Sequence, residues 1–475
     1  MQKEALFNSW VEKEERASKA SKRKYPHFDP KINFFKDIEF FKSYFANKKN
    51  VAQHSFYPFI RMIIETPRFK KTDTKDDNGK VIRKIIPKPR PLAYAAHFDA
   101  FIYSYYSTLL TIRYENKVKE WGIYENVLAY LEKGASNIEF AHEVFEYIKN
   151  KGECVALAFD ISSFFDGLDH EHLKKMWGRV INNPILPDDH FKVYKSLTDY
   201  TFVEKSDLER EFPHLVTNIK KKLYTKKICE PAEFRDRVRK KGLIKQNPFK
   251  IAVKGSSRFG HKCGIPQGSP ISACLSNIYM IEFDIRTNET INDLKGLYRR
   301  YCDDIIVVVD IKDAETARKF ILDEIKRYHL EINDTKTEIT FFKKDKTGVL
   351  RAYDDKDDYH NLQYLGFEFN GKNTYIRSSS ISRYFKRLTS RIRENLKAAY
   401  GKNSIGDTVF RKKLYNRYTD KGERNFISYA ERAADYMKSV TIEKQYKNSM
   451  KKVKEKFNKK KQEFEEKRKP KRIMK

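Results

Sequence analysis

Two adjacent carboxylates stand between two strand-like segments of this sequence, in Tyr301-Cys302-Asp303-Asp304. Residues 296–300 lead into the pair and residues 305–309 follow it, and the β-branched side chains of the second segment favour a strand. Like charges at a tight turn are unfavourable, because each carboxylate raises the pKa of the other. A divalent cation relieves this repulsion, and Mg²⁺ prefers oxygen ligands of this kind. An isolated Asp-Asp pair is more often a solvated hairpin turn, so the rest of the chain decides the interpretation.

A third carboxylate, Asp160, ends the apolar run 155–159, which predicts a buried strand. If this strand lies beside the Asp303 turn, three carboxylates meet there and can hold two Mg²⁺ ions about 4 Å apart. Nucleotidyl transfer needs such a pair of ions, one at the attacking 3′ hydroxyl and one at the leaving pyrophosphate. The alternative is that Asp160 only caps a strand end.

Three further segments fit the same chemistry. The segment 264–270 precedes a helix rich in small residues; its glycines allow close backbone approach to a ligand, and Gln267 can donate and accept hydrogen bonds. Lys336 follows an amphipathic helix and could neutralise or protonate leaving pyrophosphate. Residues 363–367 predict a strand pair in which Gly366 lets another backbone pass closely. Taken alone, segment 264–270 is equally consistent with a plain loop that leads into a helix, and Lys336 is better explained as a surface lysine.

The composition favours a polyanionic partner. Lys and Arg number 97 against 65 Asp and Glu among 475 residues, a formal net charge of +32, which points to nucleic acid. Aromatic residues make up 14% of the chain and suit stacking as well as core packing. No run approaches 18 apolar residues, so no membrane span is expected. The five cysteines are scattered without zinc spacing, which predicts a reduced, cytoplasmic protein.

Periodicity along the chain predicts a mixture of helices and strands. Helices are expected in residues 1–50, 97–148 with a break near Gly134, 271–284, 314–330 and from 378 onward. Strands are expected at 155–159, 338–342 and 362–369, with a basic hairpin tip at 70–84 and an extended segment at 87–91. The basic segment 177–262 is expected to be largely helical, with a loop from 242 to 260.

In this order and spacing, the segments resemble the motifs of a reverse transcriptase. Asp160, the Pro266-Gln267-Gly268 segment and the Tyr-X-Asp-Asp signature around Asp303 correspond to successive palm motifs of that family. Asn333 and Lys336 resemble the next motif of the family. Leu365, Gly366 and Phe367 resemble its primer grip. Lys88-Pro89-Arg90-Pro91 is similar to the fingers segment that contacts the incoming triphosphate, so that the resemblance spans residues 88–367.

The resemblance implies a role for each matched residue. Asp160, Asp303 and Asp304 would form a catalytic site for two Mg²⁺ ions, with Mn²⁺ as an alternative, and Lys336 would assist the leaving group. Phe165 matches the aromatic gate that excludes a 2′ hydroxyl, which favours dNTP over NTP. Further substrate contacts would come from Lys88, Arg90, Gln267 and Gly268.

The resemblance also implies an α+β right-hand polymerase with a ferredoxin-like, antiparallel palm sheet and a helical thumb. Fingers would occupy residues 1–150, the palm 151–376 with the basic insertion 177–262 partly on the fingers side, and the thumb with its basic tail 377–475. Partners would be a structured non-coding RNA template and the growing RNA–DNA duplex.

Within the family, Asp166-Gly167-Leu168-Asp169-His170 resembles bacterial group II intron and retron enzymes. Cys302, the segment 130–145 and the segment 425–430 instead resemble the defence-associated "unknown group", closest to the type 2 antiphage system, in which a neighbouring non-coding RNA is the template. No zinc cluster, RNase H acidic set or retron signature is found in the sequence.

Three alternatives remain at this stage. A non-catalytic RNA-binding protein on a polymerase fold would retain its biological activity without Asp303. An intron maturase or retron-like enzyme would be flanked by an intron or a retron RNA gene. An RNA-templated RNA polymerase is disfavoured by Phe165.

Overall fold

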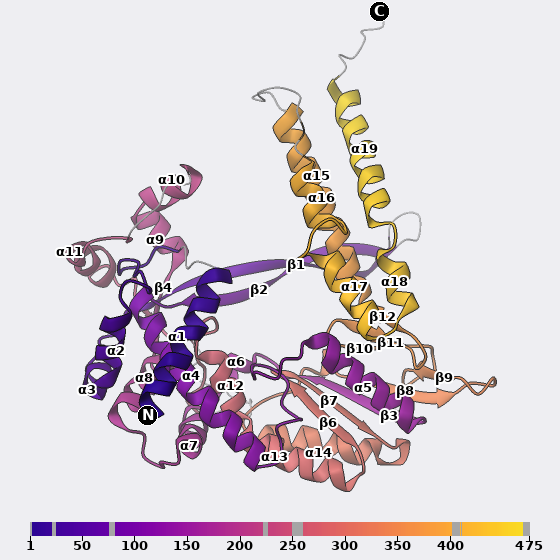
Figure 1. Cartoon of the computed structure of the whole chain (residues 1–475), viewed down its shortest axis with the longest axis horizontal. Coiled ribbons are helices and arrows are strands. Elements are labelled where there is room, and N and C mark those ends of the chain that lie inside the picture. The colour runs from indigo at the N-terminus through magenta and orange to yellow at the C-terminus, as the bar shows by residue number, and fades with distance from the viewer. Residues whose placement is uncertain are drawn as a thin grey trace, which may run out of the picture.

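The computed structural model describes residues 2–20, 25–75, 81–221, 227–248, 260–400, 409 and 411–468. These residues form many helices around separate sheets, of which the central one is wholly antiparallel, so the expected α+β class is confirmed. Figure 1 shows three parts: helices and a sheet at the left, the central sheet at the lower right, and two long helices rising above it.

The central sheet has the strand order β6-β7-β3-β8-β9. Its strands are β3 (Cys154–Asp160), β6 (Leu297–Tyr301), β7 (Asp304–Val309), β8 (Glu338–Lys344) and β9 (Leu350–Tyr353). The sheet lies between α5 (Asn137–Lys151) on one face and α13 (Ile281–Asp293) with α14 (Ala314–Arg327) on the other (Figure 1).

Burial of both faces explains why β3 is almost continuously apolar. Val155 and Leu157 belong to the core shared with α14, whereas Cys154 and Ala156 belong to the core shared with α5. Successive side chains of a strand point to opposite faces, so a strand covered on both sides needs apolar residues at every position. The predicted strands at 155–159 and 338–342 are confirmed; β9 was not predicted.

The N-terminal part combines helices with a long hairpin. The hairpin consists of β1 (Phe59–Lys75) and β2 (Val81–Tyr94). It contains the predicted tip at 70–84, of which residues 76–80 lie outside the described residues. The expected helices are α1 (Gln2–Ala20), α2 (Ile38–Ala46), α3 (Lys48–Ala52) and α4 (His97–Glu120). The fully buried ring of Trp10 contacts aromatic rings of α2 and α4 and so joins these helices.

Residues 164–248 continue this part of the molecule. Their helices are α6 (Phe164–Gly167), α7 (His170–Ile181), α8 (Asp188–Thr198), α9 (Lys205–Glu211), α10 (His214–Lys221), α11 (Pro231–Glu233) and a π-helix (Phe234–Arg239). Two strands were not predicted: β4 (Thr201–Glu204) pairs with β1 in parallel, and β5 (Lys245–Gln246) pairs with β4. Most of the predicted loop at 242–260 lies outside the described residues.

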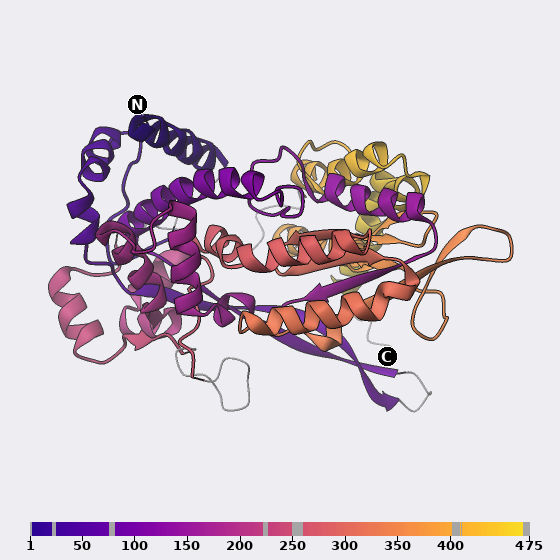
Figure 2. The same cartoon turned by 90° about the horizontal axis from the view of Figure 1, so that it is seen from below.

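The C-terminal part is helical from Ser378, as expected. A small sheet of β10 (Leu362–Tyr364), β11 (Phe367–Phe369) and β12 (Thr374–Ile376) leads into it. Its helices are α15 (Ser378–Tyr400), α16 (Lys412–Tyr418), α17 (Phe426–Tyr436), α18 (Val440–Tyr446) and α19 (Ser449–Arg468). Leu388 and Ile392 of α15 share a core with Val453 and Phe457 of α19, so these two helices run side by side, as Figure 1 shows. Figure 2 shows the C-terminal helices, in yellow, at the other end of the molecule from the N-terminal helices, in indigo.

In the described part of the chain, no helix combines the length and apolar character that crossing a membrane requires. The division at residues 150 and 376 stays a prediction.

Candidate active site

The backbone of the central sheet brings the three predicted aspartates together. Asp160 is the last residue of β3, and it pairs in register with Asp304, the first residue of β7. Asp303 lies in the turn before β7, and its carbonyl accepts a hydrogen bond from the backbone N–H of Ile161 at 3.0 Å. The predicted strand, turn and strand are thus confirmed, and their adjacency follows from pairing of strands 144 positions apart along the chain.

The turn itself has an unusual conformation. Tyr301 pairs with Asp304, so Cys302 and Asp303 form a two-residue hairpin turn in which Cys302 has φ +59°. Glycine is the usual residue at such a position, and another residue held there costs about 1–3 kcal/mol. The surrounding protein must therefore hold this turn in place.

A buried arginine supplies that support. The Arg300 Nη1 group donates to the carbonyl oxygen of Cys302 at 3.0 Å and to Asn277 Oδ1 at 3.1 Å. Its Nε and Nη2 groups donate to the two carboxylate oxygens of Asp284 at 2.7 and 2.6 Å. Arg300 and Asp284 are both fully buried, and Tyr298 also donates to Asp284 at 2.6 Å.

Sequence reasoning did not identify Arg300, Asp284 or Asn277 as part of the site. One signal was present: period-two alternation places Arg300 on the same face of its strand as Tyr298 and Cys302, which is the buried face. A charged residue at a buried strand position needs a partner, because an unpaired buried charge is strongly destabilising.

The Cys302 side chain packs under the turn. Its Sγ accepts a hydrogen bond from the Tyr130 hydroxyl at 3.6 Å, and burial raises the pKa of the thiol to about 11. The thiol is therefore neutral near pH 7 and takes no part as a nucleophile.

The electrostatics at the end of β3 favour a bound cation. Removal of water by the surrounding protein raises the pKa of Asp304 to about 7, and the carboxylates of Asp303 and Asp160 add to this rise. Lys336 and Arg377 act in the opposite direction. Oxygen donors crowded in this way suit a divalent cation, because the cation relieves their repulsion.

Lys336 occupies the position next to Asp160. The Asn333 N–H donates to the carbonyl oxygen of Asp160 at 2.8 Å and fixes the following 3₁₀ turn (Asp334–Lys336), whose Lys336 Nζ forms an ion pair with Asp160 Oδ2. Among the described residues, no group of three or more His, Cys, Asp or Glu side chains is arranged to hold a metal ion. The backbone therefore brings the three aspartates close together, as expected. In this structure, however, the Asp160 carboxylate is paired with Lys336.

The loop 264–270 lies against the base of the hairpin. The Ala93 N–H donates to the carbonyl oxygen of Gln267 at 2.8 Å. Gly268 has φ +113°, and a Cβ atom there would come within 2.9 Å of the Ala93 carbonyl oxygen. The close backbone approach predicted for this glycine is therefore to β2 of the chain itself, and the Gln267 side chain remains exposed.

Phe165 lies beside this loop, and Lys88 and Arg90 lie on strand β2 of the hairpin. Phe165 belongs to α6, is partly buried, and accepts a backbone hydrogen bond from Ile265 at 3.0 Å. Arg90 is exposed on β2 opposite Ile64, and Lys88 pairs with Thr66, although the Lys88 side chain lies outside the described part. The hydrogen bond from Ala93 to Gln267 joins this hairpin to the loop.

The predicted strand pair 363–367 is confirmed as the β10–β11 hairpin. Leu365 and Gly366 form its turn with φ of +44° and +92°. Asn137 Nδ2 donates to the Leu365 carbonyl oxygen at 2.9 Å, and the Arg377 N–H donates to the Gly366 carbonyl oxygen at 2.9 Å. The turn is therefore held from α5 on one side and from the start of the C-terminal helices on the other.

Residues 179–369 match the family described as reverse transcriptase (RNA-dependent DNA polymerase). This range is less than half of the chain and holds Asp303, Asp304 and Lys336, whereas Asp160 precedes it. The chain therefore carries a reverse transcriptase domain within this range. The fold is that of a right-hand polymerase with an antiparallel palm sheet.

Solved structures of telomerase are similar to this chain. The apo enzyme of Candida tropicalis truncated from its C-terminal domain is 12% identical, with a TM-score of 0.36, over 72% of this chain and 60% of that chain. The Candida tropicalis enzyme with a TWJ fragment of telomeric RNA is 15% identical, with a TM-score of 0.37, over 90% of this chain and 67% of that chain. The corresponding Candida albicans complex is 12% identical, with a TM-score of 0.34, over 93% of this chain and 68% of that chain.

This chain therefore spans 60% of the length of the first of these structures. No curated protein matches the sequence.

Proposed function

Because the chain carries a reverse transcriptase domain, we propose that this protein copies a dedicated non-coding RNA into DNA in bacterial antiphage defence. The observation that carries the polymerase chemistry is the in-register pairing of Asp160 with Asp304, beside the Asp303 turn. This pairing supports a site at which carboxylates from two strands face one reacting phosphate.

In this proposal Asp160, Asp303 and Asp304 hold two Mg²⁺ ions, which supply activation of the 3′ hydroxyl and stabilisation of the leaving pyrophosphate. Mn²⁺ is the alternative ion. Asp304 must release its proton before it can bind a cation, and its pKa of about 7 makes this step pH-dependent. Lys336 pairs with Asp160 in this structure. With Asp160 serving as a metal ligand, the Lys336 Nζ would be available to neutralise pyrophosphate and to donate hydrogen bonds to it.

The incoming dNTP is placed between the hairpin and the loop 264–270. Phe165 excludes a 2′ hydroxyl, and Gln267 and Gly268 contact the template and the nucleotide. Lys88 and Arg90 hold the triphosphate through charge-assisted hydrogen bonds. Leu365, Gly366 and Phe367 position the primer end, and the two contacts that fix their turn support this role.

The template partner is a structured RNA in this proposal. The net charge of +32 supports a polyanionic partner, and RNA of this kind is recognised through shape and phosphates. The protein would then hold both this RNA and the growing RNA–DNA duplex in the bacterial cytoplasm. The antiphage role follows the resemblance of Cys302 and its neighbouring motifs to the defence-associated group.

The test is sequencing of nucleic acid that co-purifies with the protein expressed from its native locus. Wild type is compared with the double variant Asp303→Ala/Asp304→Ala. We expect one dominant RNA in both samples and complementary DNA only in wild type, with DNA synthesis reduced about 1,000-fold or more in the variant.

Phe165→Ala serves as a matched variant, because it leaves the three aspartates intact. It is expected to incorporate NTPs more readily while still making DNA. Heterogeneous RNA with no DNA that depends on the aspartates would instead favour a non-catalytic RNA-binding protein. Unchanged discrimination between NTP and dNTP in Phe165→Ala would contradict the gate assignment.

A further inference from the structure

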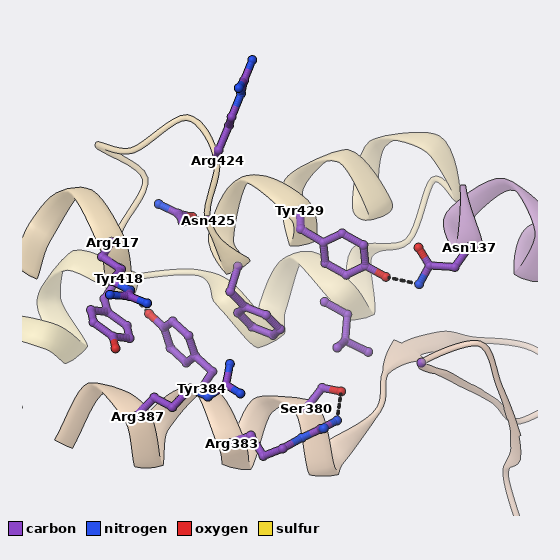
Figure 3. A pocket seen from close by; sticks show the side chains of 13 residues that line it. Asn137, Ser380, Arg383, Tyr384, Arg387, Arg417, Tyr418, Arg424, Asn425 and Tyr429 are labelled. Atoms are coloured by element: carbon purple, nitrogen blue, oxygen red, sulfur yellow. Dashed lines mark hydrogen bonds between the residues drawn. The ribbon is translucent and has the colours of Figure 1, made fainter. Parts of the chain in front are cut away.

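A cavity of about 420 Å³ lies between α15, the segment from α16 to α17, and the turn at Gly366. Figure 3 shows α15 on one side of it, α17 on the other and α5 at one end. The lining residues are Asn137, Gly366, Ile376, Ser380, Arg383, Tyr384, Arg387, Arg417, Tyr418, Arg424, Asn425, Phe426 and Tyr429. We call this cavity the arginine pocket. Its volume is within the range of ligand sites, which runs from about 300 to 1,000 Å³.

Arginines, and no acidic residues, line the arginine pocket. Four of its lining residues are arginines. Within the described part of the chain, none of the four guanidinium groups forms a salt bridge; Arg383 donates to Ser380 Oγ at 3.1 Å and to the Ser379 carbonyl oxygen at 3.2 Å. Four arginines gathered around one cavity repel each other, and an anion in the cavity would remove that cost.

The floor of the pocket is aromatic and closely packed. The rings of Tyr384 and Phe426 stack with centroids 4.8 Å apart, and the Tyr384 hydroxyl donates to the Tyr418 carbonyl oxygen at 2.6 Å. The Tyr429 hydroxyl accepts from Asn137 Nδ2 at 3.0 Å, as Figure 3 shows. Such a floor offers an apolar surface to a sugar or base, while the arginines around it offer hydrogen bonds to phosphate.

The wall that carries Arg417 and Arg424 is fixed before any ligand binds. The Asn425 side chain donates to the carbonyl oxygens of Asn416, Thr419 and Gly422 at 2.8–3.0 Å, and it accepts from two N–H groups at the start of α17. A methyl group on Gly422 would overlap the Asn416 carbonyl oxygen. Walls held in this way lose little entropy when a ligand binds.

We propose that the arginine pocket binds the 5′ triphosphate of a nucleotide, separately from the catalytic aspartates. The triphosphate would lie among the guanidinium groups of Arg383, Arg387 and Arg417, with its nucleoside over the aromatic floor. Two sources carry this chemistry, a free nucleoside triphosphate and the 5′ end of an RNA transcript.

The concentration of charge favours a triphosphate over an internal phosphodiester. A phosphodiester carries one negative charge, and even a phosphate monoester reaches only about two. A triphosphate places more charge within one small volume, which matches four guanidinium groups around one cavity better than a strand passing through it. Arginine is also the residue suited to several hydrogen bonds with phosphate oxygens at fixed geometry.

Metal dependence separates this site from the catalytic one. The arginine pocket has no carboxylate lining, so it supplies no ligand for Mg²⁺ and needs none to bind a triphosphate. Binding of a triphosphate at the aspartates, in contrast, would need divalent cations to offset the repulsion between carboxylates and phosphates. A triphosphate bound in the presence of EDTA therefore reports on the arginine pocket.

The experiment measures binding of ATP and of a short RNA with a 5′ triphosphate to the full chain, freed of nucleic acid, in EDTA. The background is Asp303→Ala/Asp304→Ala, so the result does not depend on whether the protein reverse transcribes. RNAs of the same sequence with a 5′ monophosphate and a 5′ hydroxyl are measured beside it. Arg387→Ala and Arg417→Ala are compared with Arg393→Ala, which removes the same charge from α15 outside the pocket.

We expect Arg387→Ala and Arg417→Ala each to weaken binding of triphosphate-bearing probes about tenfold or more, and Arg393→Ala to weaken it less than about twofold. Binding of ATP alone identifies the free nucleotide as the ligand, whereas binding of the RNA alone identifies the transcript end. Equal affinity for RNAs with a triphosphate and a hydroxyl end, no binding of either probe, and equal losses in all three variants would each overturn the proposal.

Discussion

The turn formed by Cys302 and Asp303 and the arginine pocket differ in how their positive charges are paired. At the turn, Arg300 is fully buried and donates hydrogen bonds to Asp284, to Asn277 and to the Cys302 carbonyl oxygen. In the pocket, Arg387 and Arg417 are exposed, and no salt bridge within the described residues involves them. The buried Arg300–Asp284 pair holds the backbone of the turn in place. The exposed arginines of the pocket have no salt-bridge partner within the described residues and remain available to a ligand.

The largest effect is expected at the buried pair. Arg300→Met leaves the Asp284 carboxylate buried without its partner, so the free energy of unfolding should fall by about 3–5 kcal/mol. DNA synthesis should fall as well, because the Cys302 carbonyl loses the group that holds the turn. Chemical denaturation and primer extension measure the two effects.

The double variant Arg300→Met/Asp284→Leu distinguishes positioning from stability. Replacing both charges by apolar side chains is expected to restore most of the stability, since no buried charge remains unpaired. It should leave kcat low. A double variant with full kcat would show that the turn does not need Arg300.

The next effect tests whether the arginine pocket depends on the packing of the segment between α16 and α17. Gly422→Ala places a methyl group against the Asn416 carbonyl oxygen, and such overpacking costs about 1–3 kcal/mol. The denaturation midpoint should fall and triphosphate binding should weaken. Lys421→Ala, an exposed neighbour, is the control; equal stability of the two variants would show that the loop accommodates the methyl group.

A smaller effect is expected from pH at the aspartates. The folded-state pKa of Asp304 lies near 7, above its ordinary value, so this group favours the metal-free fold below about pH 4 and loses that contribution as the pH rises through 7. Cation binding has the opposite trend and should weaken up to about tenfold per pH unit below 7, because a proton competes for the carboxylate.

Thermal unfolding at pH 5, 6, 7 and 8, with and without Mg²⁺, tests both trends. Asp304→Asn should flatten the pH dependence of the metal-free protein. Stability in the presence of Mg²⁺ that does not rise between pH 6 and pH 8 would contradict the assignment of Asp304 as a ligand.

The smallest effect on stability should come from the exposed arginines of the arginine pocket. Arg387→Ala removes an exposed charge without a salt bridge, so the free energy of unfolding should change by no more than about 0.5 kcal/mol. Denaturation of this variant beside Arg300→Met gives the comparison directly. A loss of several kcal/mol in Arg387→Ala would mean that the pocket arginine has a structural role.

The sequence by itself determined the elements and the chemistry near the aspartates. Continuous apolar residues before Asp160 predicted a buried strand, and the β-branched run after Asp304 predicted another, because such patterns depend on local periodicity. The spacing of these segments also carried the resemblance that the family match to residues 179–369 supports. The roles of Phe165, Gln267 and Lys88 remain predictions.

Only the tertiary structure decided which side chains act on one another. Asp284 lies 16 positions before Arg300 and Asn137 lies 228 before Leu365, and nothing in either local pattern specifies those partners. The short strand β4 was missed because its four residues do not make it a strand by themselves. It is a strand because it pairs with β1, whose partner residues lie 143 positions away in sequence. The arginine pocket likewise exists only because α15, α17 and the Gly366 turn meet, since long-range packing, and not local sequence, brings unpaired charges together.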